Sequence, residues 1–292
     1  LHLLSRRQRQ MCIRDSRNRN KWDIASHPMN ESTFAGSLAN EEMGVPGVSP
    51  YLAFGKTYGK MTGMPVGLIQ TSLGGSPMER WNPKDGDLYL NMLDKIHQTG
   101  GKYAGVLWYQ GCSDTNPGPA EKYLEHFREY VEATRKELGY EIPFFTMQLN
   151  RQINGINDEC WGMVRDAQAR AAKEIPGVSV LTTSNLSLCD GIHNTAQANV
   201  ALGEKLAKQC AHVLNGKEEY QPPELVKVER ADEAERKSFQ LEGSGIWLKL
   251  TCDHVKNCFL VYSAVGKDSG FTLTDSEGEV AVSYTHLTLP TT

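Results

Sequence analysis

Four short apolar runs alternate with amphipathic segments along most of this 292-residue chain. The runs MPVGLIQTS, YAGVLWYQ, IPFFTMQLN and GVSVLTTS have the length and composition of buried strands. Apolar side chains recur at helical spacing between them, over residues 48–62, 120–138, 158–173 and 195–214. Ser49 and Pro50 predict the start of the first helix, and Gly139 the end of the second. This alternation predicts an α/β fold with a parallel sheet between two layers of helices.

Polar residues follow each apolar run, in the stretches LGGS, QGCSD, LNR and LSLCDGIH. In a parallel sheet the carboxyl ends of the strands meet at one edge, where ligands bind. The four loops therefore predict a single site at that edge.

The pattern changes after residue 216. Residues 217–280 carry short alternating segments such as GIWLKLTC and NCFLVYSAV, with turn residues between them and no helical period. We expect a β-rich accessory region there, following an α/β domain over residues 17–216.

The two ends of the chain share an inverted repeat at the DNA level. Suitable codons for Arg6 to Ser16 read, in reverse complement and in frame, as Ala281 to Thr291. Agreement over eleven successive codons is not chance, and the repeat resembles the translated adaptor of a sequencing library. We therefore expect residues 1–16 and 281–292 to be adaptor-derived, and the native gene to be cut at both ends.

Charge and composition narrow the function classes. Without the adaptor segments, 27 basic and 34 acidic residues remain, a net charge of −7 that argues against nucleic acid as a partner. No run of 18 apolar residues occurs, so we expect no membrane span. Six cysteines remain, at spacings that fit neither a zinc ribbon nor a disulfide scaffold. Buried free thiols are the expectation, and they favour a cytoplasmic location.

Asp190 and His193, in the stretch DGIHNT, are candidates for two members of a catalytic triad. A histidine base needs a partner on Nδ1, and an aspartate three residues earlier can fold back to supply it. The alternative is an aspartate that caps the following helix beside a surface histidine. The convergence of four polar loops favours catalysis. Asp190, His193 and Cys189 lack further ligands at a recognisable spacing, so we expect no metal and no other cofactor.

The loops after the first two strands can stabilise negative charge. Gly74 and Gly75 let backbone N–H groups approach a developing oxyanion, and Gln110 can donate its amide to the same atom. The alternatives are a tight turn for the glycines and a loop-linking role for Gln110. Ser72, Gly111 and Asp114 are candidates for substrate contacts from the same loops, which their position suggests.

Several stretches together resemble the sialate O-acetylesterase family, a branch of the SGNH hydrolases. They are GLIQTSLGGSPMERW, GVLWYQGCSD, Trp161 to Gln168 and DGIHNTAQANVALGEKLA, and they occur in the family's order across most of residues 27–214. The resemblance implies a flavodoxin-like, three-layer sheet and a Ser-His-Asp hydrolase of O-acetylated sugars or glycans. It makes His193 the base, Asp190 its orienting acid, and Gly74 or Gly75 with Gln110 the oxyanion hole.

The same resemblance places the nucleophile in a Gly-Gln-Ser-Asn block after the first strand. Residues 17–280 contain no such block, so we expect a sheet that lacks its first strand and a chain that is nearly inactive alone. Cys112 stands where many relatives have glutamate. Two other readings stay open: a non-catalytic carbohydrate-binding protein of the same fold, and a hydrolase that uses Cys112, which requires a lowered thiol pKa.

Overall fold

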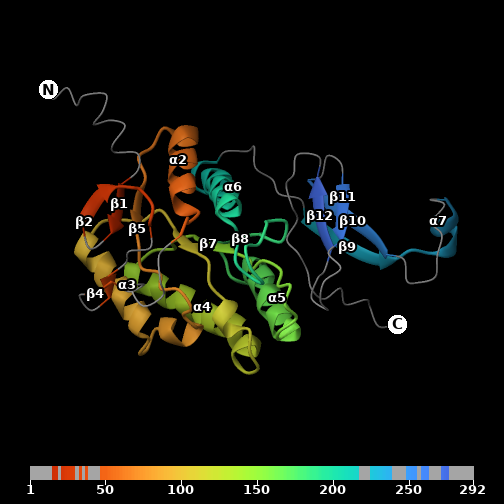
Figure 1. Ribbon diagram of the computed structural model, residues 1–292, viewed down its shortest axis with the longest axis horizontal. Helices are drawn as coiled ribbons and strands as arrows, with labels where there is room; N and C mark the ends of the chain where they lie inside the picture. Colours follow the sequence, from red (N-terminus) through yellow and green to blue (C-terminus); the bar gives the residue numbers. More distant parts are fainter. Residues whose placement is uncertain are drawn as a thin grey trace.

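The computed structural model describes residues 15–18, 21–29, 33–34, 37–38, 47–216, 224–238, 248–254, 258–262 and 271–275. The four predicted strands are present as β5 (Gly67–Ile69), β6 (Val106–Trp108), β7 (Phe144–Met147) and β8 (Val178–Leu181). The helices that follow them are α3 (Asp87–Thr99), α4 (Pro119–Leu138), α5 (Asp158–Glu174) and α6 (Ala196–Asn215), and α2 (Tyr51–Thr62) precedes β5. The predicted α/β alternation is therefore confirmed (Figure 1).

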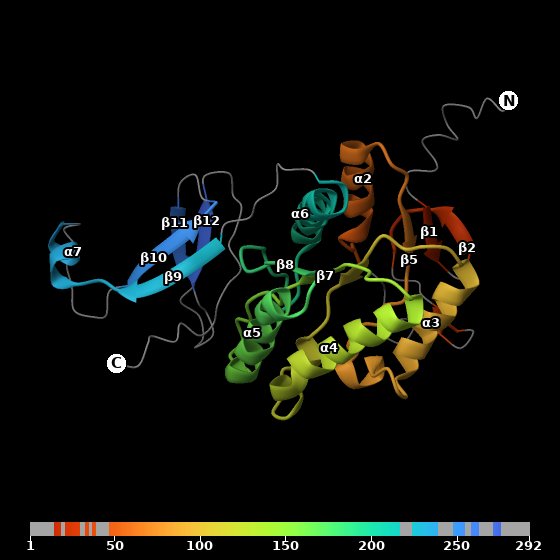
Figure 2. The ribbon, with the colours of Figure 1, turned by 180° about the vertical axis from the view of Figure 1, so that it is seen from behind.

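Helices cover both faces of the strands, α2 and α6 on one and α3, α4 and α5 on the other (Figures 1 and 2). Neighbouring residues of β7 show why: Phe144 packs in the core under α3 and α4, whereas Phe145 packs in the core under α2 and α6. Successive side chains of a strand point to opposite faces, so a strand buried on both sides is apolar at every position. This arrangement is the predicted three-layer α/β/α fold.

The predicted end of the second helix is confirmed, and the predicted start of the first is not. Gly139 closes α4 in the left-handed conformation, with φ of 75°, and Pro119 occupies its first turn. Helix α2 begins at Tyr51, three residues later than expected. Pro50 is the cap residue and the buried Ser49 hydroxyl makes no hydrogen bond, so the predicted Ser49 cap is wrong.

Helix α3 is absent from the sequence prediction. Leu88, Tyr89 and Met92 are buried along one of its faces and Gly100 ends it. The spacing of these residues is helical, but the preceding NPKDGD stretch reads as a long loop. Two short 3₁₀ turns, η2 (Met78–Trp81) and η3 (Cys112–Asp114), also lie in the loops at the carboxyl edge.

The sheet is interrupted between β5 and β6. Strands β6, β7 and β8 pair in parallel, while β5 belongs to a second sheet in the order β2–β1–β5. Strands β5 and β6 are thus end strands of two sheets, and a cavity of about 520 Å³ is lined by residues of both. The gap agrees with a sheet that lacks its first strand.

Strand β1 (Asp15–Asn18) pairs in parallel with the other edge of β5, and β2 (Lys21–Ile24) pairs with β1. Asp15 and Ser16, inside the segment with a predicted adaptor origin, lie opposite Gly67 and Leu68. Ladder hydrogen bonds use only the backbone, which every residue except proline can supply. This pairing therefore does not test the origin of residues 1–16, which stays a prediction.

Two antiparallel pairs lie beyond residue 216. Strand β9 (Glu224–Arg230) pairs with β10 (Leu248–Asp253), and β11 (Cys258–Tyr262) pairs with β12 (Phe271–Asp275). A short helix, α7 (Glu233–Ser238), follows β9, where no helix was expected. A two-residue pair, β3 (Thr33–Phe34) with β4 (Ser37–Leu38), lies near the start. Among all described helices, none combines the length and the apolar character that crossing a bilayer needs.

Candidate active site

The loop between β8 and α6 holds Asp190 against His193. One carboxylate oxygen of Asp190 accepts the backbone N–H groups of Ile192 and His193, at 2.8 and 2.7 Å. The other, Oδ2, lies 2.7 Å from Nδ1 of His193. The α6 cap is Thr195, whose hydroxyl accepts the N–H of Ala198. Asp190 therefore faces the imidazole and does not cap the helix, so the cap predicted by the alternative interpretation is wrong.

The backbone donors keep Asp190 charged. They are the main cause that lowers the pKa of Asp190 to about 2, and the His193 side chain adds to the effect. An anionic Asp190 accepts a hydrogen bond from Nδ1 of His193, and in the neutral imidazole this tautomer leaves the lone pair on Nε2. Both side chains are exposed, so Nε2 is accessible. The pair has the arrangement of a general base and its orienting acid.

The His193 loop is tied to the loops after β6 and β7. The amide of Asn194 donates to the Tyr109 hydroxyl at 3.2 Å, and Asn150 donates to Asn194 Oδ1 at 2.7 Å. The Arg151 guanidinium donates to the carbonyl oxygens of Ser184 and Leu186, at 2.7 and 2.9 Å. These bonds place Asn194 beside Tyr109. The loop that carries His193 therefore lies next to the loop that carries Gln110.

Sequence reasoning missed Asn150, Arg151 and Asn194 as the links between these loops. The signal was present in the LNR stretch after the third strand and in the asparagine that follows His193. Neither pattern says which loop the side chain will reach, because that depends on the order of strands in the sheet.

Gln110 is fastened in place by buried groups. Its amide donates to the Ser76 carbonyl at 2.9 Å and to the carboxylate of Asp114. The backbone carbonyl of Gln110 accepts from the Tyr123 hydroxyl at 3.0 Å and from the Gln168 amide at 2.9 Å. Both amide hydrogens are thus engaged in this structure, as expected of a residue that links the loops after β5 and β6. An oxyanion role requires one of them to be redirected.

Asp114 is the partner that fixes this second loop. It is 3% exposed and accepts the backbone N–H of Met78 at 3.0 Å, besides the Gln110 amide. Burial raises the pKa of Asp114, and these hydrogen bonds oppose the rise. Asp114 is therefore buried beneath the loop and holds it through these hydrogen bonds, which differs from the substrate contact that we expected.

The glycines of both loops occupy positions where a side chain would be costly. Gly75 has φ of 65° in the exposed turn after β5. Gly111 has φ of 140°, and a Cβ there would lie 3.0 Å from Val164. Gly74 and Ser72 are exposed in the same turn region as Gly75, and Ser72 also lines the cavity between β5 and β6. The turn thus leaves backbone groups accessible at the rim.

An aromatic cluster supports these loops from the α3–α4 side. Trp81 packs edge-on against Trp108 at 5.1 Å between ring centroids, and Trp108 lies 4.5 Å from Tyr130. Trp108 is buried, as expected for a core aromatic, whereas Tyr109 is only half-buried and uses its hydroxyl to hold Asn194.

A hydrolase that uses Cys112 as its nucleophile requires a lowered thiol pKa, and the structure gives the opposite. Burial raises the pKa of the Cys112 thiol to about 11, and the charges of Asp114 and Asp190 act in the same direction. A thiol with a raised pKa stays protonated at neutral pH and is a poor nucleophile. Five cysteines form no disulfide in the described part of the chain: Cys112, Cys160, Cys189, Cys210 and Cys252. Of these five, only Cys210 is fully buried, fewer than expected.

Residues 4–212 match the profile of a family described as carbohydrate esterase, sialic acid-specific acetylesterase. The chain belongs to this family. The match begins at residue 4, inside the segment with a predicted adaptor origin, so it does not separate adaptor from native sequence.

A probable carbohydrate esterase from Arabidopsis thaliana is 26% identical over 197 residues, which cover 64% of this chain and 70% of that protein. The X-ray structure of an Arabidopsis thaliana protein superposes with a TM-score of 0.60 and 25% identity, covering 70% and 82% of the two chains.

Two more distant structures share the fold. A carbohydrate acetylesterase from Xanthomonas citri has a TM-score of 0.59 at 22% identity, covering 78% of this chain and 52% of its own. The structure of NanS has a TM-score of 0.54 at 13% identity, covering 70% and 88%.

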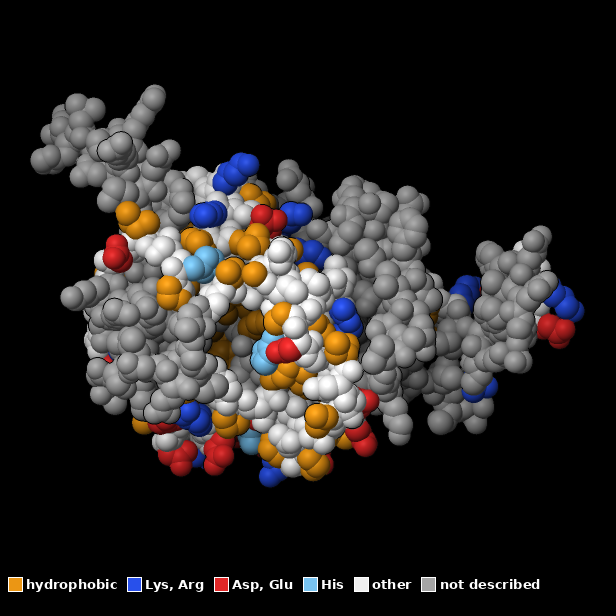
Figure 3. All heavy atoms as spheres, viewed as in Figure 1, with side chains coloured by type: hydrophobic (Ala, Val, Ile, Leu, Met, Phe, Trp, Pro, Cys, Tyr) orange, Lys and Arg blue, Asp and Glu red, His pale blue; other side chains and the backbone are white. Residues whose placement is uncertain are grey.

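A space-filling view shows that one face of the molecule is hollowed (Figure 3). Figure 3 shows a hollow lined partly by hydrophobic side chains, with a histidine and an acidic side chain beside each other at its rim. In this member of a carbohydrate esterase family, Asp190 and His193 thus lie in contact and exposed in the loop after β8.

Proposed function

We propose that this chain is the catalytic part of a serine carbohydrate O-acetylesterase that acts on O-acetylated sugars such as sialic acid. One observation carries the proposal: Nδ1 of His193 lies 2.7 Å from the charged Asp190, with Nε2 exposed at the carboxyl edge of the sheet. Membership in the carbohydrate esterase family supplies the substrate class.

In this mechanism a serine hydroxyl attacks the acetyl carbonyl while His193 Nε2 accepts its proton. Asp190 stabilises the imidazolium that forms. The oxygen of the tetrahedral intermediate receives hydrogen bonds from the backbone of Gly74 or Gly75 and from the Gln110 amide, after one amide hydrogen turns away from Ser76 or Asp114. His193 then gives the proton to the departing sugar oxygen, and water releases acetate from the serine in a second round.

The nucleophile is assigned to a Gly-Gln-Ser-Asn block upstream of the serines in the rim loops. Ser76 is buried, donates to the Leu73 carbonyl and accepts from the Trp81 indole, so its hydroxyl is already committed. Ser72 and Ser113 lie in loops without the sharp strand-to-helix turn of a nucleophile elbow. Ser72 lines the cavity between β5 and β6, and Gly111 supplies the positive φ of the turn after β6. Asp114 holds the same loop through its hydrogen bonds to Met78 and Gln110.

The test compares the chain of residues 1–292 with a protein that carries the upstream serine block, using 4-nitrophenyl acetate and O-acetylated sialic acid. We expect the longer protein to release acetate and the shorter chain to be nearly inactive. His193→Ala should abolish the activity. His97→Ala is the matched control, because His97 is an exposed histidine paired with Glu137 away from the site. Full activity of His193→Ala would refute the proposal.

A carbohydrate-binding protein without hydrolysis is the second candidate, favoured by the absence of the serine block from residues 17–280. It predicts that the longer protein binds O-acetylated sugars without releasing acetate. Calorimetric titration with O-acetylated sialic acid, followed by assay of free acetate in the same sample, separates the two.

A further inference from the structure

His193 lies near the tip of a short hairpin formed by residues 187–195, which we call the base hairpin. An antiparallel backbone bridge pairs Leu188 with Asn194. The side chains of His193 and Asp190 are 65% and 52% exposed. Among the described residues, Asp190 is the only side chain that hydrogen-bonds the imidazole. The tip therefore fixes the acid against the base, but it does not fix the base against the other loops of the site.

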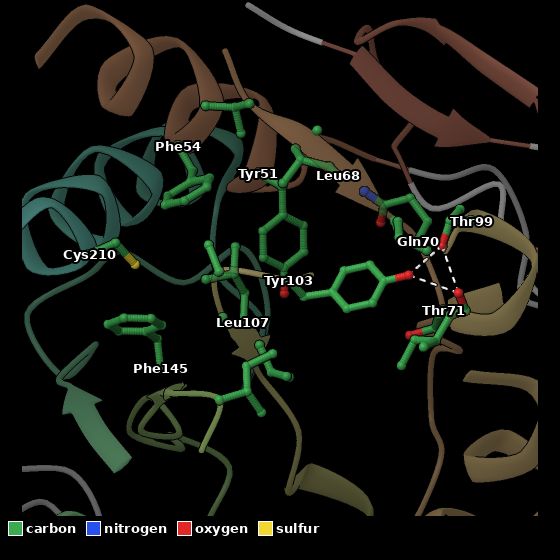
Figure 4. A pocket seen from close by; sticks show the side chains of 18 of the residues that line it. Tyr51, Phe54, Leu68, Gln70, Thr71, Thr99, Tyr103, Leu107, Phe145 and Cys210 are labelled. Atoms are coloured by element: carbon green, nitrogen blue, oxygen red, sulfur yellow. Dashed lines mark hydrogen bonds between the residues drawn. The ribbon is translucent and has the colours of Figure 1, made fainter. Parts of the chain in front are cut away.

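The cavity between β5 and β6 gives the base hairpin no support. Figure 4 shows part of the cavity lining, including Tyr103 and Leu107, and none of the described residues 187–195 belongs to that lining. One backbone bond reaches the tip, from the N–H of Ile153 to the Gly191 carbonyl at 3.0 Å. Ile153 is itself 45% exposed, so this bond ties the tip to another surface loop and not to the core.

Asn194, the residue after His193, contacts three other parts of the fold. Its Oδ1 accepts from the fully buried Asn150, after β7, at 2.7 Å. Its Nδ2 donates to the Tyr109 hydroxyl, after β6, and to Oδ1 of Asn199, in the first turn of α6, each at 3.2 Å. Both amide hydrogens and the amide oxygen are thus engaged, so the side chain cannot rotate without losing a hydrogen bond.

Backbone groups at both ends fix the direction of these hydrogen bonds. The N–H of Arg151 can only donate, so its partner on Asn150 at 2.8 Å is Oδ1, which leaves Nδ2 to face Asn194. The carbonyl of Val48 can only accept, so its partner on Asn199 at 2.8 Å is Nδ2, which leaves Oδ1 to face Asn194. Asn194 must therefore present an acceptor to one asparagine and a donor to the other. An asparagine meets both demands, whereas an aspartate of the same shape meets only one.

The contact with Tyr109 connects the base hairpin to the loop of Gln110, which is next in the chain. The amide of Gln110 is in turn bonded to the Ser76 carbonyl at 2.9 Å. The path from His193 to Gln110 therefore consists of two peptide bonds and one side-chain hydrogen bond, from Asn194 to Tyr109. A shift of about 1 Å between reacting groups can cost about 10²-fold in rate, so a loss of this hydrogen bond should be measurable.

From these contacts we propose that Asn194 is a positioning residue, whose amide sets the distance between His193 and the loop of Gln110. In this role it acts through His193 and not on the acetyl group. The effect on rate rests on the proposed esterase function, whereas the anchoring of the base hairpin is tested without catalysis. The two parts are therefore measured separately.

The first test measures kcat and KM for 4-nitrophenyl acetate in the protein that carries the upstream serine block. Asn194→Ala should lower kcat about 10- to 100-fold and change KM by less than about two-fold. The midpoint of the pH profile should stay in place, because the Asp190–His193 bond lies within the tip. A residue that only stabilises the fold would lower the melting temperature and leave kcat per folded molecule unchanged.

Two further variants keep the test decisive if Asn194→Ala fails to fold. Asn194→Asp keeps the shape and loses the donors, and it should lower kcat to a similar extent on the alkaline plateau of the pH profile. Tyr109→Phe removes only the hydroxyl that Asn194 contacts. The double variant Asn194→Ala/Tyr109→Phe should be no slower than Asn194→Ala alone, because the shared contact is already lost. Additive losses would overturn the proposal.

The opposite end of α6 offers matched controls. The Tyr58 hydroxyl donates to Oδ1 of Asn215 at 2.7 Å, so Asn215→Ala and Tyr58→Phe remove a bond of the same kind. Asn215 is the last residue of this 20-residue helix, about 30 Å from its start. Both control variants should keep kcat within about two-fold of the unsubstituted protein, even where the melting temperature falls.

The second test needs no catalysis and uses the chain of residues 1–292. Nitrogen relaxation should give backbone order parameters near 0.85 for residues 189–193, and in Asn194→Ala these should fall toward about 0.6. Nuclear Overhauser effects between the Tyr109 ring and the hairpin should disappear. The ring nitrogen shifts of His193, which report its Nδ1–H tautomer, should stay unchanged because Asp190 remains in contact.

Each result has a defined consequence. An unchanged kcat in Asn194→Ala, or a loss that appears in KM alone, overturns the proposal and keeps the esterase. Order parameters and Overhauser effects that do not change in Asn194→Ala also overturn it. If the unsubstituted longer protein releases no acetate, the proposed function fails, and the mobility of the base hairpin alone decides whether Asn194 anchors His193.

Discussion

Asp190 and Asp114 are aspartates in loops at the same rim of the sheet, held in opposite ways. Asp190 is exposed and bonded within its own loop, to Ile192 and His193. Asp114 is buried and bonded across the fold, to Met78 and Gln110. The pKa of Asp190 falls to about 2, whereas burial raises the pKa of Asp114. The comparison sets Asp190, the carboxylate proposed to orient His193, against Asp114, which holds a loop through hydrogen bonds. Replacing the first should affect mainly the activity, and replacing the second mainly the stability.

The largest expected effect is on activity, from His193→Ala. In the protein with the serine block, loss of the base should lower the acetylesterase rate by about 10⁴-fold or more. The exposed side chain packs little, so the free energy of unfolding should change by less than about 0.5 kcal/mol. Rates and urea unfolding curves measure the two. A large loss of stability with modest loss of rate would reverse the assignment.

Asp190→Asn should lower the same rate by about 10³–10⁴-fold, because an amide no longer favours the Nδ1–H tautomer of His193. The asparagine oxygen can still accept the two backbone N–H groups, so stability should hold. Asp94→Asn, an exposed aspartate on α3, is the matched control. A normal rate for Asp190→Asn would show that the carboxylate is structural only.

Asp114→Ala should act mainly on stability. It leaves the Met78 N–H and the Gln110 amide without their acceptor in a buried place, at a cost of about 2–4 kcal/mol of unfolding free energy. Urea unfolding of the chain of residues 1–292 measures it. A change below about 0.5 kcal/mol would mean that Asp114 does not hold the loop.

Asp190 should also give a small pH effect of defined sign. Its folded pKa of about 2 lies below the unfolded value, so its contribution to stability is present above about pH 4 and lost as pH falls toward 2. Carbon NMR of the labelled carboxylate should show a midpoint near 2. A midpoint near 4 would contradict the hydrogen bonds described for the loop.

The smallest effect is expected at Cys112. Because the pKa of its thiol is raised to about 11, iodoacetamide should react slowly at neutral pH and faster only as pH approaches that value. Cys112→Ser should change the esterase rate by no more than about a few-fold. Rapid alkylation that abolishes activity would restore the cysteine mechanism.

The sequence by itself determined the strands, most of the helices and the Asp190–His193 pair. These follow from short-range rules: periodicity of apolar side chains, glycine at a helix end, and two residues three apart in one loop. Helix α3 was missed because a polar, proline-containing loop precedes it. The inverted repeat was likewise inferred from the sequence alone, by choosing codons for its two ends, and the adaptor origin stays a prediction.

Only the tertiary structure decided which loops meet and what each polar residue does there. Gln110 and Asp114 bond to Ser76 and Met78, more than thirty positions away, and Asn194 bonds to Tyr109 across 85. The raised pKa values of Cys112 and Asp114 depend on burial, which only the packed fold determines. The open edges of β5 and β6 likewise appear only when the strands are placed side by side. A sequence pattern indicates whether a side chain lies on the buried or the exposed face of its helix or strand. Which residue it then contacts depends on how the helices and strands pack together.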